Sequence, residues 1–127
     1  DAVSQLLAHD LVVPAPGQGA LAVEIRSDAD ATIADAVRLL DDRATRAAVT
    51  AEREALRVLE AGCAAPVGAY ARVQGDRLRL HVRVISPDGT LQLNEVGAGP
   101  LSEAGSLGRA AAHALLGRGA GQLMRST

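Results

Sequence analysis

The sequence predicts an α+β fold in which helices cover one face of a three-stranded antiparallel sheet. Apolar residues recur at helical spacing up to Leu59, and the period changes to two from Val67. Helical spacing returns after Ser102, so helical regions enclose the alternating segments. Such alternation is typical of an antiparallel sheet with one solvated face, whose apolar face the helices must bury.

Composition limits the core and the classes of function. The chain of 127 residues is 48% hydrophobic, which is enough for one ordinary core. It has one Tyr and neither Phe nor Trp, so Leu, Val, Ile and Ala must fill that core with little area per side chain. All 13 basic residues are Arg, but the net charge of −2 is not that of a nucleic-acid-binding protein.

Single features exclude further classes. One cysteine excludes an internal disulfide framework and a cysteine-based zinc site. No apolar run reaches about 18 residues, so we expect no membrane span. The chain opens with Asp1 and shows neither a start Met nor a signal peptide, which leads us to expect a piece of a longer product.

The first part of the chain is expected to contain a short helix, a loop and a strand. Residues 1–9 can form the helix, Pro14 and Pro16 break regular structure, and Gly17-Gln18-Gly19 forms the loop. Side chains alternate over residues 20–26, which predicts a strand. Its apolar side consists of Leu21, Val23 and Ile25.

Two helices are expected next. Residues 27–30 supply N-cap candidates for a helix that ends near residue 40. Asp41 or Asp42 can cap a second helix over about residues 43–61. The apolar stripe of this second helix is expected to comprise Ala48, Val49, Ala55, Leu56 and Leu59.

The second half is expected to continue with strands and a final helix. The strands are predicted over residues 67–74, 77–84 and 90–96. Gly75-Asp76 and Ser86-Pro87-Asp88-Gly89 are turn signals between them. A Gly/Pro loop over residues 97–100 leads to Ser102, an N-cap candidate for a helix to about Leu116.

Two groups of residues suggest binding sites, one for a dinucleotide and one for a metal ion, that their spacing does not favour. Gly17-Gln18-Gly19 is no dinucleotide fingerprint, because Ala22 stands in place of the third glycine and a strand follows. A tight entry into that strand is favoured over a backbone that lines a cleft. The histidines are scattered without ligand spacing, so we expect no metal site at His9, His81 or His113.

Charged side chains give two further expectations. The row formed by Arg77, Arg79 and Arg83 is read as the solvated face of an exposed strand rather than as a site for an anionic partner. Glu52 interrupts the apolar stripe of the second helix. We expect its carboxylate to pair with Arg46 or Arg53.

Cys63 is the candidate nucleophile, since it is the only thiol. Gly62 suits a helix C-cap and Pro66 prevents the helix from continuing, so Cys63 is predicted on a short loop at a helix end. The negative end of a helix raises a thiol pKa, and no His or Asp lies nearby in the sequence. By spacing alone a buried small residue is favoured over a covalent role, and both stay open.

Separated motifs resemble those of the porphobilinogen deaminase family, also called hydroxymethylbilane synthase. They are Pro14-Ala15-Pro16-Gly17-Gln18-Gly19-Ala20-Leu21-Ala22-Val23-Glu24, Thr50-Ala51-Glu52-Arg53, and Leu59-Glu60-Ala61-Gly62-Cys63-Ala64-Ala65-Pro66-Val67-Gly68-Ala69-Tyr70. Ser86-Pro87-Asp88-Gly89 also fits the last domain of the family. The resemblance covers essentially the whole chain in order.

The resemblance implies a cytoplasmic, three-domain transferase of tetrapyrrole and heme biosynthesis. Such an enzyme condenses porphobilinogen units head to tail with loss of ammonia and releases the linear hydroxymethylbilane. The family builds this polypyrrole on a dipyrromethane cofactor held by a thioether to one cysteine, which corresponds to Cys63 here. A soft sulfur nucleophile suits attack on the electrophilic azafulvene that deaminated porphobilinogen forms.

The same resemblance implies that the chemistry is divided between domains. Residues 1–60 would be the end of the cleft-forming region with a connecting helix, and residues 61–127 the cofactor-bearing C-terminal domain. The family's catalytic aspartate and its substrate arginines lie in earlier domains, and no motif here matches them, so we assign no catalytic residue. We expect the chain alone to be inactive, with a free Cys63 thiol and no dipyrromethane. Without its sheet, the strand over residues 20–26 should be disordered, repacked or paired with another copy.

Two rival classes remain. Helix, three strands and helix is also the order of a double-stranded-RNA-binding domain, but such a domain needs basic residues where this last helix begins with Ser102-Glu103-Ala104-Gly105. We therefore expect no RNA binding. A cysteine-based redox or hydrolytic domain would need a low-pKa thiol at Cys63, which slow alkylation at neutral pH would exclude.

Overall fold

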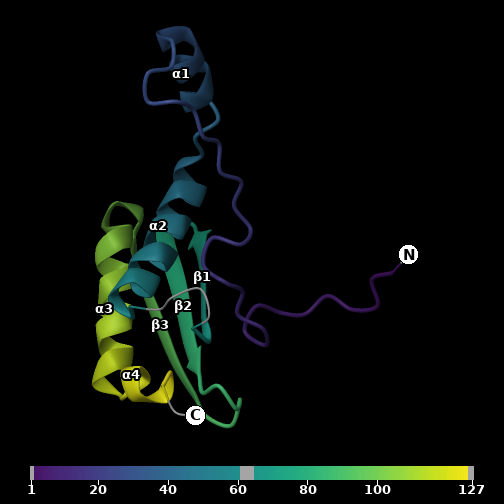
Figure 1. The fold of residues 1–127 in the computed structure, drawn as a ribbon, viewed down its shortest axis with the longest axis vertical. Helices are drawn as coiled ribbons and strands as arrows, with labels where there is room; N and C mark the ends of the chain where they lie inside the picture. The colour runs from purple at the N-terminus through teal and green to yellow at the C-terminus, as the bar shows by residue number, and fades with distance from the viewer. Residues whose placement is uncertain (1, 61–64, 126–127) are drawn as a thin grey trace.

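The two longest helices pack on one face of the sheet, as predicted (Figure 1). The computed structural model describes residues 2–60 and 65–125. The elements are α1 (Ala31–Arg38), α2 (Arg43–Val58), β1 (Val67–Gln74), β2 (Arg77–Ile85), β3 (Gln92–Pro100), η1 (Leu101–Glu103), α3 (Ala104–Gly117) and α4 (Ala120–Leu123). The antiparallel sheet has the order β1-β2-β3, and α2 and α3 pack together across it (Figure 1). This confirms the α+β class.

The central strand β2 supplies the middle of the core. Its residues Leu78, Leu80, Val82 and Val84 are fully buried. Opposite β2 on the neighbouring strand, Ala71 pairs with Leu80 and Ala69 with Val82, and both alanines are buried as well. The alternation along β2 therefore separates a dry face from a polar one, because successive side chains of a strand point to opposite faces.

The helix α2 begins and ends close to the predicted positions but faces the core with a different stripe. The side chain of Asp42 accepts a hydrogen bond from the Thr45 N–H at 2.7 Å, which makes Asp42 the N-cap. The helix ends at Val58, three residues before the predicted end. Its buried apolar residues are Ala47, Ala51 and Ala55, with Leu59 at the C-cap, whereas Ala48, Val49 and Leu56 are only half-buried.

Close approach of α3 explains this rotation. A Cβ on Gly108 would collide with the backbone carbonyl of Ala51, so the two helices meet backbone to backbone at these residues. Small residues therefore face the crossing, while the larger Val49 and Leu56 lie at its side. A prediction from hydrophobicity alone favours larger side chains at the buried positions. The predicted apolar stripe of α2 therefore differs from the stripe that the structure buries.

The third strand and the last helix also differ from prediction. β3 continues to Pro100, so residues 97–100 are strand rather than loop. Glycines permit this, since a Cβ on Gly97 would lie 2.9 Å from a Leu107 side-chain carbon of the overlying α3. Ser102 lies in η1 and is not the N-cap of α3, a position that Glu103 occupies without a side-chain cap bond.

The first 26 residues contain neither the predicted helix nor the predicted strand. Residues 2–9 form no helix, and residues 20–26 pair with no strand among the described residues. Leu21 is 98% exposed. A short helix without packing is marginal, and a strand needs a partner. The purple end of the chain at the N-terminus projects from the body, and α1 stands beyond the end of the sheet (Figure 1).

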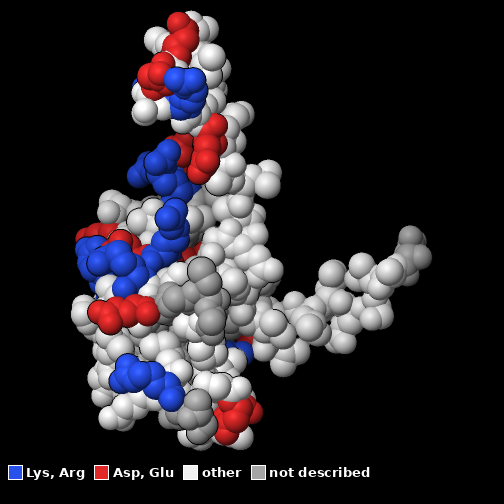
Figure 2. Space-filling model, in the orientation of Figure 1, with Lys and Arg blue, Asp and Glu red and all other residues white. Residues whose placement is uncertain are grey.

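The surface of α2 carries charges of both signs. Basic side chains along α2 are accompanied by acidic ones on the face that Figure 2 shows, as in the pairs Arg46–Asp41 and Arg57–Glu54. Within the described ranges, no helix is long and apolar enough to cross a membrane.

Candidate functional site

Glu52 is a buried carboxylate that joins three separate segments of the chain. It lies in the middle of α2 and is 6% exposed. Its Oε2 accepts the Gly17 N–H at 2.7 Å, and its Oε1 accepts the Ala71 N–H, also at 2.7 Å. The predicted pairing with Arg46 or Arg53 is wrong, since backbone N–H groups are its partners.

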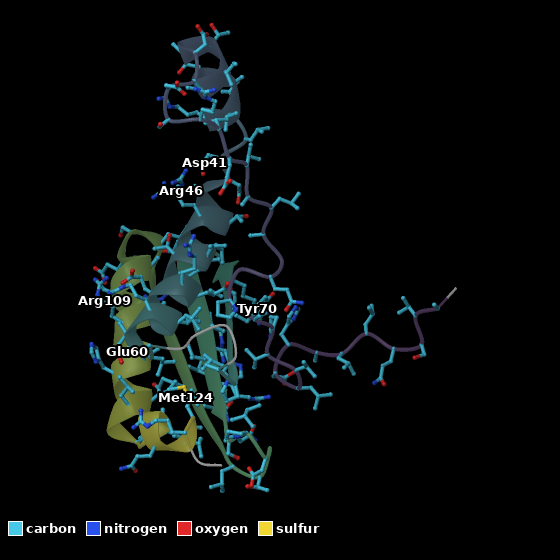
Figure 3. The ribbon with its side chains drawn as sticks, in the orientation of Figure 1. Asp41, Arg46, Glu60, Tyr70, Arg109 and Met124 are labelled. Atoms are coloured by element: carbon cyan, nitrogen blue, oxygen red, sulfur yellow. The ribbon has the colours of Figure 1, made fainter. Side chains whose placement is uncertain are left out.

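The arginines named for Glu52 are placed elsewhere. Arg46 donates from Nε to both carboxylate oxygens of Asp41, at 2.8 and 2.9 Å, and the two side chains lie together at the start of α2 (Figure 3). Arg53 is exposed. Glu52 faces the sheet instead of solvent and accepts hydrogen bonds from backbone N–H groups. A pattern of side chains in the sequence does not indicate such partners.

The segment before Gly17 lies along the free edge of β1. The Ala69 N–H donates to the Pro14 carbonyl at 2.9 Å. A Cβ on Gly68 would lie 2.6 Å from the Val13 carbonyl, so only glycine permits this approach. Together with the bond from Ala71 to Glu52, these contacts satisfy N–H groups that an edge strand otherwise exposes.

The backbone of the loop Gly17-Gln18-Gly19 lines a cleft. From the sequence this is the less favoured alternative, since a tight entry into a strand is expected. Gly17 has φ 73°, a left-handed conformation that glycine adopts without steric cost. The cleft has a volume of about 550 Å³ and is bounded by this loop, the first half of α2 and the middle of β1. Its lining is mostly apolar with a few polar groups, as is usual for ligand sites.

Burial and hydrogen bonding act in opposite directions on Glu52. Burial raises the pKa of the Glu52 carboxyl above its ordinary value, while the N–H groups of Ala71 and Gly17 favour the charged form. Burial has the larger effect on the pKa. The carboxylate is therefore a structural acceptor whose protonation would alter the hold on the loop.

Cys63, the predicted cofactor anchor, lies outside the described residues. The described chain places its two flanks. On one side α2 ends at Val58 and Glu60 has φ 52°, and on the other the Pro66 carbonyl accepts the Ile85 N–H at 3.0 Å just before β1. Cys63 therefore belongs to the connection between the two elements that Glu52 joins, and its role stays a prediction.

The histidines occupy different surroundings. The His9 ring stacks on Tyr70, with centroids 4.0 Å apart and planes inclined by 3°. His81 Nε2 lies 3.0 Å from Asn94 Oδ1, and His113 is exposed on α3. Among the residues that the structure describes, no group of three or more His, Cys, Asp or Glu could hold a metal ion.

The predicted row of solvated arginines is solvated only in part. Arg79 is exposed, and Arg77 is exposed while donating to the Ala98 carbonyl at 3.3 Å. Arg83 instead donates to the backbone carbonyls of Asp10 and Leu11, at 2.7 and 3.0 Å. It holds residues 10–11 against the outer face of the sheet, which a strand pattern by itself does not predict.

These features define an α+β domain whose sheet is covered by helices on one face and whose free edge is bound by an upstream segment. The family model for "Porphobilinogen deaminase, C-terminal domain" matches residues 46–117. The chain belongs to the porphobilinogen deaminase family.

Curated relatives extend this likeness to nearly the whole chain. The chain is 42% identical over 125 residues to a porphobilinogen deaminase of Pelotomaculum thermopropionicum, covering 98% of this chain and 40% of the relative. It is 48% identical over 122 residues to the protein of the same name from Acidothermus cellulolyticus, covering 91% and 36%. For that of Thermobifida fusca the identity is 46% over 135 residues, covering 98% and 41%. The chain thus spans about two fifths of the length of these relatives.

Proposed function

We propose that the chain is the C-terminal, cofactor-bearing part of a porphobilinogen deaminase. The whole enzyme would condense four porphobilinogen molecules into hydroxymethylbilane, with loss of ammonia at each step. The observation that supports this is the junction at Glu52. The motif segments over residues 14–24 and 50–53, and the strand that follows Cys63, are separated in sequence and are joined by that one carboxylate.

Cys63 is proposed as the anchor of the dipyrromethane cofactor. Its sulfur would bond to the aminomethyl carbon of porphobilinogen as the carbon–nitrogen bond breaks. Ammonia leaves with the thiol proton, so the step needs no oxidant or reductant. In the sequence Cys63 follows α2 and precedes β1, so the anchor would lie in the connection between a helix and a sheet strand.

The described cleft fits part of such a ligand. Apolar side chains and the loop backbone can take flat pyrrole rings, but the described lining includes no Arg to pair with acetate and propionate groups. We therefore assign carboxylate binding and acid–base chemistry to the remaining domains of the enzyme. The 127-residue chain alone is accordingly proposed to be inactive.

No observation favours the RNA-binding alternative. The turn before α3 carries Glu103, and the first basic residue of the helix is Arg109, which is paired with Glu54. Recognition of phosphates by the start of that helix would need free basic side chains there.

A chimera tests the proposal. The C-terminal two fifths of the Pelotomaculum thermopropionicum relative would be replaced by this chain, which makes Cys63 the only cysteine available at the anchor position. Intact-mass measurement should show an added mass equal to two porphobilinogen molecules less two of ammonia, and the chimera should consume porphobilinogen.

Matched variants of the chimera distinguish loss of cofactor attachment from loss of folding. Cys63→Ser should lose both the added mass and the activity while keeping the circular dichroism spectrum of a folded protein. A second variant, Cys63→Ser with Ser102→Cys, keeps one thiol on the domain at an exposed position and should not regain the adduct. A folded chimera without the adduct, or an adduct that survives Cys63→Ser, would overturn the proposal.

A further inference from the structure

Two arginines stand directly opposite each other on the face of the sheet that the helices do not cover. Arg72 on β1 pairs with Arg79 on β2 in the strand register, and the next pair along is Tyr70 with His81. Leu78 and Leu80 are buried toward the helices, so the residues that alternate with them face away. Like charges at directly opposite positions destabilise an antiparallel pair.

Neither guanidinium group is neutralised by a partner within the described chain. Arg72 and Arg79 take part in no hydrogen bond or ion pair among those residues, and both are exposed. Their neighbours differ, because Arg77 donates to Ala98 and Arg83 is bonded to the N-terminal segment. The outward positions of the strands hold no Asp or Glu in the described register.

A pocket lies over these two arginines. Its volume is about 430 Å³, and it is closed on one side by residues 8–10 of the N-terminal segment. Stacked rings of His9 and Tyr70 line both this pocket and the cleft beside Glu52, so the stack stands between the two cavities. Figure 3 shows Tyr70 where the N-terminal segment passes β1.

His81 adds a third polar group to the pocket. Asn94 Oδ1 accepts the Arg83 Nε–H at 2.7 Å, which identifies this amide atom as an acceptor. His81 Nε2 lies 3.0 Å from the same oxygen and must therefore carry a hydrogen. The opposite ring nitrogen, Nδ1, remains as a polar atom of a side chain that lines the pocket.

We propose that this pocket binds a small ligand that carries two oxyanion groups, one for each of Arg72 and Arg79. A guanidinium fork binds a carboxylate or a phosphate through two parallel hydrogen bonds. A dianion also relieves the repulsion between the paired arginines, which a single monoanion does only in part. The exposed Asp10 is the acid at the rim and favours compact anions that stay near the arginines.

Titration calorimetry of the chain tests this site with inorganic pyrophosphate, succinate and acetate at one ionic strength. At least one of the two ligands with two oxyanion groups, pyrophosphate or succinate, should bind with 1:1 stoichiometry and about tenfold or more tighter than acetate. Preference for pyrophosphate identifies a phosphate-type ligand, and preference for succinate a dicarboxylate. Equal weak binding of all three anions would overturn the proposal.

Charge-matched variants locate the binding. Arg72→Gln with Arg79→Gln should weaken binding of the preferred dianion about tenfold or more. Arg43→Gln with Arg53→Gln removes the same charge from exposed positions on α2 and should leave it unchanged. Arg79→Lys keeps the charge but removes the fork, and should weaken binding about threefold. Equal loss in the α2 control, or no loss in the Arg72 and Arg79 variant, would contradict the site.

Discussion

The backbone carbonyl of Ala51 on α2 lies where a Cβ on Gly108 of α3 would have to be. Ala51 is fully buried, so neither helix can turn this contact toward solvent. The crossing of α2 and α3 therefore depends on the absence of one methyl group. The distance between α2 and α3 affects how α2 lies on the sheet. It therefore also affects the position of Glu52, which α2 carries.

Gly108→Ala should destabilise the fold by about 1–3 kcal/mol, because the added methyl meets backbone rather than a movable side chain. Urea unfolding would measure the loss. Gly117→Ala on the same helix is the control, since a Cβ there meets nothing within 4 Å. That control should be neutral or stabilise by about 0.4–1 kcal/mol, as expected for Gly→Ala in a compatible conformation. Equal effects of the two variants would contradict the tight crossing.

Glu52→Gln tests the junction between the three segments. An amide offers one oxygen to the Gly17 and Ala71 N–H groups and turns its NH₂ toward one of them, which leaves a buried donor unpaired. We expect a loss of about 1–3 kcal/mol in the free energy of unfolding. Amide hydrogen exchange should show lower protection at Gly17 or Ala71, with Leu80 unaffected at the centre of the sheet. Unchanged protection at both amides would show that the carboxylate is dispensable.

The same variant has a defined pH dependence. Burial raises the pKa of Glu52 above its ordinary value of 4.5, so the folded chain binds this proton more tightly than the unfolded chain does. The stabilisation from the proton is fully present below the unfolded-state pKa and is lost as the pH rises through the folded-state value. The free energy of unfolding of the wild type minus that of Glu52→Gln should therefore decrease as the pH rises from 4.5. An increase over that interval would show that the N–H groups outweigh burial.

Glu54 should behave in the opposite way. Hydrogen bonds from Arg57 and from Arg109 lower the pKa of Glu54 to about 2. Each guanidinium lies 3.0 Å from Oε2, and Arg109 joins α2 to α3. The stabilisation by this charge is present above the ordinary pKa of 4.5 and is lost as the pH falls toward 2.

Urea unfolding from neutral pH down toward pH 2 would check the effect of Glu54. The midpoint for Glu54→Gln should fall less steeply over the acid range than the midpoint for wild type. Glu24→Gln is the control, because Glu24 is exposed and in no ion pair within the described chain. High salt should reduce the difference, since these groups are close to solvent. Parallel acid profiles for wild type and Glu54→Gln would refute the assignment.

The sheet and its core were predictable because their signals are local. From Arg77 to Val84 in β2, polar and apolar side chains alternate, and burial follows the same alternation. Capping of α2 by Asp42 is likewise determined by the residues next to it. For the candidate site, only the motif segments could be named in advance, and the loop at Gly17 could be placed beside a cleft only as an alternative.

The remaining features depend on contacts between distant segments. The partners of Glu52 are backbone N–H groups, which every residue except proline carries, so no side-chain pattern announces them. The stripe that α2 buries is chosen by the close approach at Gly108, a property of the helix pair and not of α2 alone. Residues 20–26 show strand alternation in the sequence, but alternation cannot supply a pairing partner.

The thiol of Cys63 should be unmodified in the chain produced alone. Assembly of dipyrromethane, by the family resemblance, uses an aspartate and arginines for which this sequence has no matching motif. Intact-mass measurement of the purified chain should give the unmodified mass, and alkylation should add one label. A covalent two-pyrrole adduct would show that the chain attaches the cofactor without the other domains.

The segment over residues 20–26 should drive self-association of the chain produced alone. Leu21, Val23 and Ile25 are 98%, 56% and 43% exposed, and an exposed apolar segment with strand alternation can pair with the same segment of another copy. Light scattering should show a mass that rises with concentration, and Leu21→Arg should suppress the rise. Leu39→Arg, at an 87% exposed position after α1, removes similar apolar surface outside the segment and should leave association intact. A monomer at every concentration would contradict this prediction.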